Sequence, residues 1–490
     1  MSRRPKLVAI VLATVLSAAF IFAWRRLVDP LGFIGAVPTT LEVPALGVSA
    51  LVTSLLGTIM AYAASRSSRA YPLRWGILVL LLLAMAGGIW ALTARLGQPS
   101  IAWRLQHLLQ METQLDSSGR LERQDLSFWL AAFGRGAEAR AFSTRFESPY
   151  GGRDELPADD LPEPEPPLTV DSVPWAQAIQ EIAARERIVI IMEAHHVTEH
   201  REWIEQTLPL FRREGFSHYA VEALAESGDA LKKRGFPVES TGFYLADPRF
   251  GNLLRSAIAL DFSIHDYETP LAVDPAQREE QQARALARIV AAHPGCKILI
   301  HAGFAHAFKQ PIPGFGPCMA ARLWEQTGIE PYCIYQGSAE FDAPQYPQWV
   351  VRCGATEEPR MLIPPPRGLK DPQFTDIPAG AIDALVIHPL PNGRPPGARQ
   401  PRFSSGMTRV SGRWLEPNWP IVVGAYRTGE SIEAIALDQV LLRDGESEFE
   451  LWIPSPPFEL RVTSATGRIA IDIEMNRSEL EIRGVAKNQD

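Results

Sequence analysis

Cysteine is scarce in this sequence, with 4 among 490 residues, and no two cysteines form a C-x-x-C pair. The missing pair spacing gives no sign of a cysteine-ligated zinc site. All four lie in the second half of the chain, at Cys296, Cys318, Cys333 and Cys353. Such a cluster is expected either to form two disulfides in an oxidising compartment or to consist of buried free thiols.

The sequence also lacks an excess of basic residues. Its 48 Lys and Arg stand against 56 Asp and Glu, the formal net charge is -8, and no basic stripe follows the first few positions. This charge balance excludes nucleic acid as an expected partner. A hydrophobic content of 46% with 21% charged residues is enough to build a core, which excludes a disordered or fibrous chain.

Charged side chains are absent from three long apolar segments, residues 7–24, 43–64 and 75–92. Each is long enough to cross a bilayer as a helix, so the sequence predicts a membrane domain over residues 1–97 with three transmembrane helices. The distribution of Lys and Arg between these segments predicts a multi-pass protein integral to the inner (cytoplasmic) membrane, with its C-terminal domains periplasmic or extracellular. Alternatively, the first segment is a cleaved signal peptide.

Three further sections flank the central part of the chain. Residues 98–148 predict a helical hairpin around the sequence DSSG. This loop resembles a calcium-binding loop with Gly119 at its turn and Asp125 at its end, but Gln114 takes the first ligand position, which favours a plain hairpin. Residues 149–174, rich in proline and acid, predict a solvated linker. Residues 401–490 contain short alternating runs that indicate a small antiparallel β-sandwich.

The central section, residues 175–400, alternates short apolar runs with helical stretches. The runs RIVIIM, HYAVEA, DFSIHDY and CKILIHA predict strands of a parallel sheet with helices on both faces, so the fold class is α/β. The carboxyl ends of parallel strands meet at one edge, where ligands gather. All four strand ends carry polar residues, among them His196, His265, Asp266, Tyr267 and Glu268. Glu193, His195, Glu222 and His306 are expected to form one site at this edge, with Arg278 and His301 nearby.

The motifs at these strand ends resemble those of a known superfamily. The sequence MEAHHVTEHREW contains Glu193 and His195, AVEAL contains Glu222, and HAGFAH contains Gly303 and His306. This set is similar to that of ChaN-like haem-binding proteins, Tiki (TraB) metalloproteases and erythromycin esterases, which share two Gly-x-x-His motifs with an acidic residue between them. The first motif departs from the usual pattern at one position, where Met192 replaces glycine. Its histidine can also be assigned in two ways: the ChaN- and Tiki-like spacing selects His195, and the esterase-like spacing selects His196.

The residue types and the resemblance imply a membrane-anchored hydrolase of an ester or amide bond that acts on a small molecule or a peptide. His195, His306 and Glu222 would hold a divalent metal ion, or an imidazole would deprotonate water while a carboxylate such as Glu193 fixes its tautomer. Arg278 would bind an anionic substrate group or a developing oxyanion. The plain alternative for Arg278 is a solvated helix arginine.

A second function stays open on the same residues. In the ChaN-like case the domain binds haem or another cofactor without turnover, and Tyr267 and His301 are the candidate ligands. Each also has an ordinary explanation. Tyr267 would be a core aromatic with a bonded hydroxyl, and His301 a hydrogen-bonded core histidine.

A rival motif overlaps the first one. HVTEH, His196–His200, fits the H-x-x-E-H pattern of inverted zinc peptidases. That pattern belongs inside a longer helix, whereas here a strand is predicted to end just before it, so His200 is expected to contribute little. His218 and His293 are expected to be structural, because they lie at the opposite end of the predicted sheet.

Overall fold

The computed structural model describes residues 100–114, 120–143, 172–268, 274–303, 306–312, 316–337, 358–365, 377–388, 406–417, 419–454, 457–469, 471–476 and 479–484. The chain divides into two units, Met1–Gln98 and Pro99–Asp490, and all described residues belong to the second. The predicted linker, residues 149–174, lies outside the described residues up to its last three positions.

The prediction of an integral membrane protein needs correction. Across the described ranges, no helix has the length and apolar character needed to cross a membrane. The three apolar segments that led to the prediction, residues 7–24, 43–64 and 75–92, lie outside those ranges. The transmembrane helices, the membrane as partner and the inner-membrane location with periplasmic domains are therefore withdrawn.

An eight-stranded sheet forms the centre of the unit, in the order β1-β7-β8-β6-β2-β5-β3-β4. Six neighbouring strands run parallel: β2 (Ile188–Glu193), β3 (Phe216–Val221), β4 (Ser263–Asp266), β5 (Lys297–Gly303), β6 (Tyr332–Gly337) and β8 (Ala384–Ile387). At one edge β7 (Arg360–Leu362) runs antiparallel to β8, and β1 (Ser172–Pro174) antiparallel to β7. The predicted sheet was wholly parallel, whereas the sheet observed is mixed.

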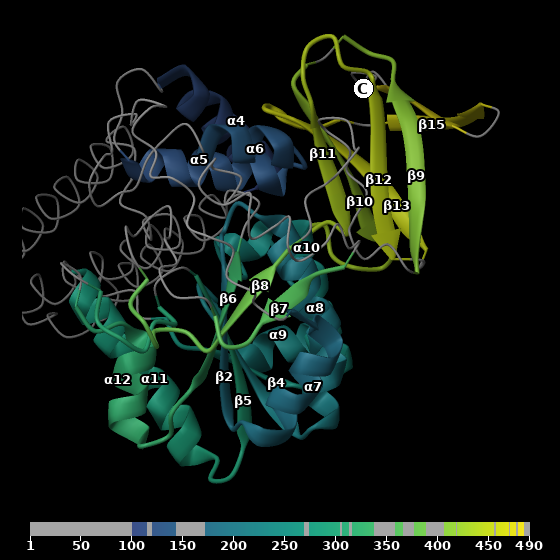
Figure 1. Ribbon diagram of the computed structural model, residues 1–490. Coiled ribbons are helices and arrows are strands. Elements are labelled where there is room, and N and C mark those ends of the chain that lie inside the picture. The colour runs from purple at the N-terminus through teal and green to yellow at the C-terminus, as the bar shows by residue number, and fades with distance from the viewer. Residues whose placement is uncertain are drawn as a thin grey trace, which may run out of the picture. The chain divides into compact units, whose positions relative to one another are not determined.

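Helices cover both faces of this sheet (Figure 1). One face carries α11 (Pro275–Ala292) and α12 (Met319–Thr327), and the other carries α7 (Trp175–Arg185), α8 (Thr198–Arg213) and α10 (Pro248–Ala259), with α9 (Gly228–Arg234) and the short helix η2 (Tyr244–Ala246) beside them. Alternate residues of β2, among them Ile190 and Met192, join the core under α11 and α12. Since side chains alternate along a strand, Glu193 points to the opposite face, toward α8.

Three helices precede the sheet in the sequence: α4 (Ile101–Gln114), α5 (Arg120–Ala132) and α6 (Gly136–Ser143). The first two match the predicted hairpin, and its loop lies outside the described residues. Asp125, the proposed last calcium ligand, is buried inside α5.

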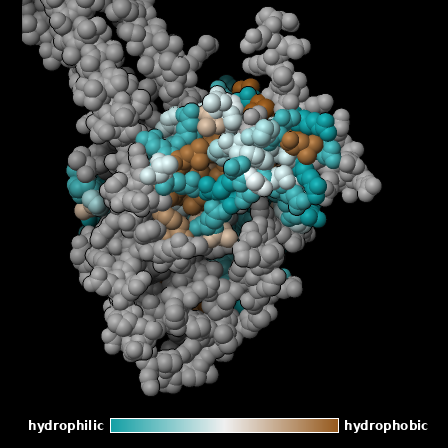
Figure 2. Space-filling model, turned by 90° about the horizontal axis from the view of Figure 1, so that it is seen from above, coloured by the Kyte–Doolittle hydropathy of each residue, from teal (hydrophilic) through white to brown (hydrophobic). Residues whose placement is uncertain are grey.

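The surface of the described residues is mixed in character. Figure 2, which views the molecule of Figure 1 from above, shows a largely hydrophilic surface with separate hydrophobic patches. This is the ordinary composition of a protein surface.

The C-terminal part folds into two four-stranded sheets, β11-β10-β13-β14 and β12-β9-β16-β15. The strands are β9 (Met407–Trp414), β10 (Ile421–Arg427), β11 (Asp438–Leu442), β12 (Glu448–Pro454), β13 (Phe458–Ser464), β14 (Gly467–Ile469), β15 (Ile471–Asn476) and β16 (Glu479–Gly484). A shared apolar core lies between the sheets. All pairs are antiparallel except β16 with β9. The predicted sandwich is present, and its one parallel pair was not predicted.

The described cysteines form no disulfide. Cys296, Cys318 and Cys333 are free, and Cys353 lies outside the described residues. The prediction of two disulfides is wrong, because each described thiol would have to take part. Cys318 and Cys333 are buried, as expected for the free-thiol alternative.

Candidate functional site

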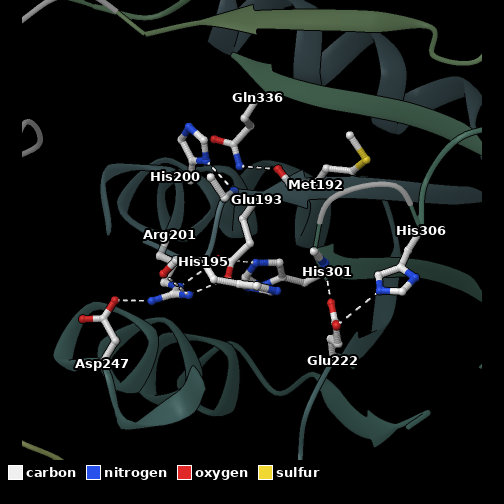
Figure 3. A network of polar contacts seen from close by, with 12 residues as sticks. Met192, Glu193, His195, His200, Arg201, Glu222, Asp247, His301, His306 and Gln336 are labelled. Carbon is white, nitrogen blue, oxygen red and sulfur yellow. Dashed lines mark hydrogen bonds and ion pairs between the residues drawn. The ribbon is translucent and has the colours of Figure 1, made fainter. Parts of the chain in front are cut away.

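Glu193, the last residue of β2, lies at the centre of a buried polar network (Figure 3). Arg201 of α8 donates to both carboxylate oxygens, at 2.8 Å from Nε to Oε2 and 2.5 Å from Nη2 to Oε1. Arg201 is fully buried and also pairs with Asp247. Burial raises the pKa of Glu193, but Arg201 and His301 lower it by more, and it lies well below its ordinary value. Glu193 is therefore ionised and can only accept hydrogen bonds.

The Glu193 carboxylate fixes the orientation of His195. Oε1 lies 2.9 Å from His195 Nδ1. Since the carboxylate only accepts, Nδ1 donates to it, and in the neutral form of the ring the lone pair is on Nε2. Tyr244 of η2 stacks on the imidazole, with ring centroids 3.6 Å apart. A Cβ placed on Gly303 would lie 2.5 Å from His195 Nε2 and 3.0 Å from Glu222 Oε2. His195 Nε2 thus lies near the Glu222 carboxylate, at a point where only glycine at position 303 leaves room.

His301 of β5 is held on both sides of its ring. Its Nε2 lies 2.8 Å from Glu193 Oε2, so Nε2 donates, and its Nδ1 accepts from the Tyr219 hydroxyl at 2.9 Å. Burial keeps the pKa of Tyr219 well above its ordinary value, which leaves that hydroxyl protonated. His301 is 1% exposed. His301 thus donates a hydrogen bond that holds the Glu193 carboxylate, as expected of a hydrogen-bonded core histidine.

Glu222, directly after β3, organises the second half of the site. Its Oε2 accepts from the backbone N–H of Gly303, and its Oε1 lies 2.7 Å from Arg278 Nη2. Arg278 of α11 also donates to both oxygens of Glu268. Burial raises the pKa of Glu222, but His306 and Arg278 lower it by more, to well below its ordinary value. Arg278 is thus an ion-paired member of the site and not a helix arginine that contacts solvent alone.

Two carboxylates near His306 favour a positive charge on its ring. Its Nδ1 lies 2.6 Å from Glu279 Oε1 and its Nε2 3.4 Å from Glu222 Oε1. Burial lowers the pKa of His306, but the Glu279 and Glu222 carboxylates raise it by more, to about 10. The protonated ring can supply charge or donate a proton near neutral pH, but it cannot accept one.

The observed residues do not fit the predicted divalent metal site of His195, His306 and Glu222. Within the described part of the chain, no three or more His, Cys, Asp or Glu side chains are placed to hold a metal ion. The Arg278 guanidinium contacts both Glu222, at 2.7 Å, and His306 Nε2, at 3.2 Å from Nη1. Its charge would repel a cation between them.

Haem ligation by Tyr267 or His301 does not fit either. The Tyr267 hydroxyl donates to the backbone oxygen of His301 at 2.8 Å, and Tyr267 is 1% exposed. Both ring nitrogens of His301 are engaged with Tyr219 and Glu193. An axial ligand needs an accessible donor atom facing an open site, and neither side chain has one.

The predicted set and the observed network overlap without being identical. Glu193, His195, Glu222, Arg278, His301 and His306 are connected through their contacts. Five further residues belong to the network but were not predicted from the sequence: Arg201, Tyr219, Tyr244, Asp247 and Glu279. Arg201 stands in the helix after the first motif, where an arginine at a buried helix position would have been a signal, but nothing in the sequence identifies its partner Asp247.

The rival H-x-x-E-H motif is not arranged for zinc. Helix α8 begins at Thr198, so His196 precedes the helix that should carry both histidines. His200 is fully buried, and its Nδ1 accepts from the backbone N–H of Ala194 at 3.0 Å. His200 therefore has a contact next to Glu193 that the sequence did not predict, and its removal would leave a buried N–H without this acceptor.

His265 lies away from the site. Its Nε2 lies 2.7 Å from His218 Nδ1, and the ring of His293 lies 4.4 Å from that of His218. Three of the ten histidines thus form a second cluster, which contains the two residues expected to be structural. Burial lowers the pKa of His218, and His265 and His293 lower it further, to about 4.

This cluster should make stability depend on pH. The unfolded chain binds a proton at His218 near pH 6.5, whereas the folded chain does so near pH 4, so stability falls as pH falls through this window. Replacing His218 with glutamine should weaken this dependence. Urea unfolding of both proteins at about pH 7 and about pH 5 measures it. Equal losses in the two proteins would contradict the prediction.

Gly303→Ala should displace His195. The added Cβ would lie 2.5 Å from Nε2, and the imidazole is held by Glu193 and Tyr244, so one of these contacts must give way. The expected cost is about 1–3 kcal/mol of stability, as for overpacked cores. A changed His195 imidazole signal in the NMR spectrum would report the displacement. An unchanged signal would show that the site has room at this point.

The chain was compared with protein-family models, curated protein sequences and solved structures. No protein-family model matches the chain, and no curated protein sequence matches it. Among solved structures, it is similar to the type III effector HopBA1, with 14% identity and a TM-score of 0.28 over 46% of this chain and 99% of that one.

Two toxin structures are similar at the same level. RRSP, a MARTX toxin effector domain from Vibrio vulnificus, has 15% identity and a TM-score of 0.26 over 49% of this chain and 56% of that one. The C-terminal region of Pasteurella multocida toxin, described with a thiol-protease-like catalytic triad, has 11% identity and a TM-score of 0.26 over 63% and 48%. This chain spans about half of each. Likenesses this low carry no argument about activity, and the ChaN-like, Tiki and erythromycin-esterase resemblance stays a prediction.

Proposed function

We propose that this chain is a hydrolase of an ester or amide bond in which His195 is the general base. One observation carries the proposal. The ionised Glu193 carboxylate accepts a hydrogen bond from His195 Nδ1, which directs the other ring nitrogen, Nε2, toward Glu222 and Gly303. A carboxylate that fixes the tautomer of an imidazole is the arrangement that activates water or a hydroxyl nucleophile.

The proposed reaction uses the two halves of the site in turn. His195 Nε2 takes a proton from water as the water oxygen bonds to the carbonyl carbon, and the carbonyl π electrons move onto its oxygen. Glu193 stays ionised and stabilises the imidazolium that forms. When the tetrahedral intermediate collapses, the bond to the leaving group breaks, and His195 returns the proton to it.

Arg278 and His306 suit the developing oxyanion. Both are positive near neutral pH and both contact Glu222, which holds them in place before the reaction begins. Preorganised positive charge in a site of low polarity stabilises an oxyanion more than water would. The substrate would therefore be a carbonyl compound, a small molecule or a peptide, whose oxygen approaches this pair.

An activated ester tests the proposal independently of natural specificity. The purified chain should hydrolyse 4-nitrophenyl acetate with saturation kinetics, and Glu193→Gln should lower the rate by weakening the acceptor for His195 Nδ1. His293→Ala, in the second histidine cluster, is the matched control and should keep the rate. A rate equal to that of buffer, or equal rates in all three proteins, would refute the hydrolase.

A further inference from the structure

A single stretch of chain, residues 244–255, contacts both the histidine site and the C-terminal sandwich. It contains η2 and most of α10. Its first part reaches the site. Tyr244 stacks on His195, and Asp247 pairs with Arg201, the arginine that binds Glu193. Asp247 also caps α10 by accepting from the backbone N–H of Arg249 at 3.0 Å. Asp247 is the N-cap residue of α10 and also the partner of Arg201, so the position of the first turn of α10 affects the orientation of Arg201.

The second part of the stretch binds the sandwich through buried polar groups. Asn252 donates to the backbone oxygen of Leu437 at 2.8 Å. Arg255 pairs with Glu430, with Nη2 2.5 Å from Oε2 and Nε 2.9 Å from Oε1, and it also donates to the backbone oxygen of Ile435. All of these partners lie in the connection between β10 and β11. They fix α10 to the sandwich along its length.

The helical hairpin connects the same two places. Phe128 of α5 packs on Tyr244, with ring centroids 5.2 Å apart, and the Arg201 guanidinium lies 5.6 Å from the Phe128 ring centroid. The far end of α5 is held by β11, because Gln439 donates to the backbone oxygen of Ala132 at 3.0 Å. Both α5 and α10 therefore link β11 to the groups around His195.

We propose that the C-terminal sandwich controls the histidine site through α10. The position of α10 fixes Asp247, the positioning residue, and Asp247 orients Arg201, which in turn orients Glu193 and His195. A partner that bound the sandwich and shifted β11 would thereby change the orientation of His195. The effect on turnover rests on the proposed function, whereas the effect on the His195–Glu193 hydrogen bond does not. The two can therefore be tested separately.

The test compares two glutamate deletions in the same sandwich. Glu430→Ala removes the partner of Arg255, and Glu448→Ala removes an exposed ion pair with Arg413 on β9. In NMR spectra of ring-labelled histidine, assigned with His195→Gln, Glu430→Ala should speed exchange of the His195 Nδ1 proton by about tenfold, the scale of one lost hydrogen bond. Glu448→Ala should leave it unchanged, and Glu430→Gln, which keeps an acceptor, should restore slow exchange.

The outcomes separate the two proposals. Faster exchange in Glu430→Ala alone, with no ester hydrolysis in any protein, would support control by the sandwich and refute the hydrolase. If hydrolysis is present, kcat should fall in Glu430→Ala with KM little changed. Equal exchange in the two alanine variants, or no protected His195 proton in the unaltered chain, would overturn the control of the site by the sandwich.

Discussion

Arg201→Met should lower the free energy of unfolding by about 3–5 kcal/mol, the cost of removing one partner from a buried ion pair. Arg201 is fully buried between Glu193 and Asp247, which are themselves buried. Methionine fills much of the same volume, so the loss would come from two carboxylates left without their cation. Urea unfolding followed by circular dichroism measures the change.

Arg413→Met is the control for this prediction. Arg413 pairs with Glu448 on the surface, with both side chains at least half exposed, and such pairs contribute about 1 kcal/mol or less. A loss below about 1 kcal/mol for Arg201→Met would show that the two carboxylates find other partners or become protonated. The account of Arg201 as the support of Glu193 would then fail.

His195→Ala should lower kcat/KM for ester hydrolysis by about 10²- to 10⁴-fold, the usual contribution of a general base. The free energy of unfolding should change much less than in Arg201→Met. His195 lies after the end of β2 and takes no part in the pairing of β2 with β5. Initial rates over a range of concentrations of the activated ester give kcat/KM, and the same urea experiment gives the stability.

His306→Gln is the informative comparison. Glutamine keeps a donor toward Glu222 but loses the positive charge that the raised pKa of His306 maintains, so the rate should fall, but by less than in His195→Ala. If His306→Gln were inactive and His195→Ala active, the roles of the two histidines would be reversed, and the general base would have to be sought beside Glu279.

The strands that could be predicted are those with strong local patterns. Residues 188–192 form an apolar run with Glu193 directly after it, and residues 298–300 form a similar run with His301 directly after it. β1 and β7 have three residues each, too few for a periodic signal. Their antiparallel pairing depends on how the chain returns to the sheet edge, which local sequence does not encode.

The candidate site shows the same limit at the level of single residues. Glu193, Glu222 and His306 could be identified from the sequence because the ends of parallel strands converge. The charge states of these residues could not be predicted from the sequence. The protonation of His306 depends on Glu279 and Glu222, residues distant in the sequence that the fold brings within 3.4 Å. For the same reason Asp247 carried no signal until its contact with Arg201 was visible.

The strand order also dictates when the site can form during folding. β5 lies between β2 and β3, although it follows both in the chain. The contact of His301 with Glu193 spans 108 positions, and that of Gly303 with Glu222 spans 81. Contacts between such distant residues form late, since loop closure must be achieved first. A nascent chain that ends before β5 would hold Glu193 and Glu222 without the residues that support them, so we expect the site to assemble only after β5 has paired with β2 and β3.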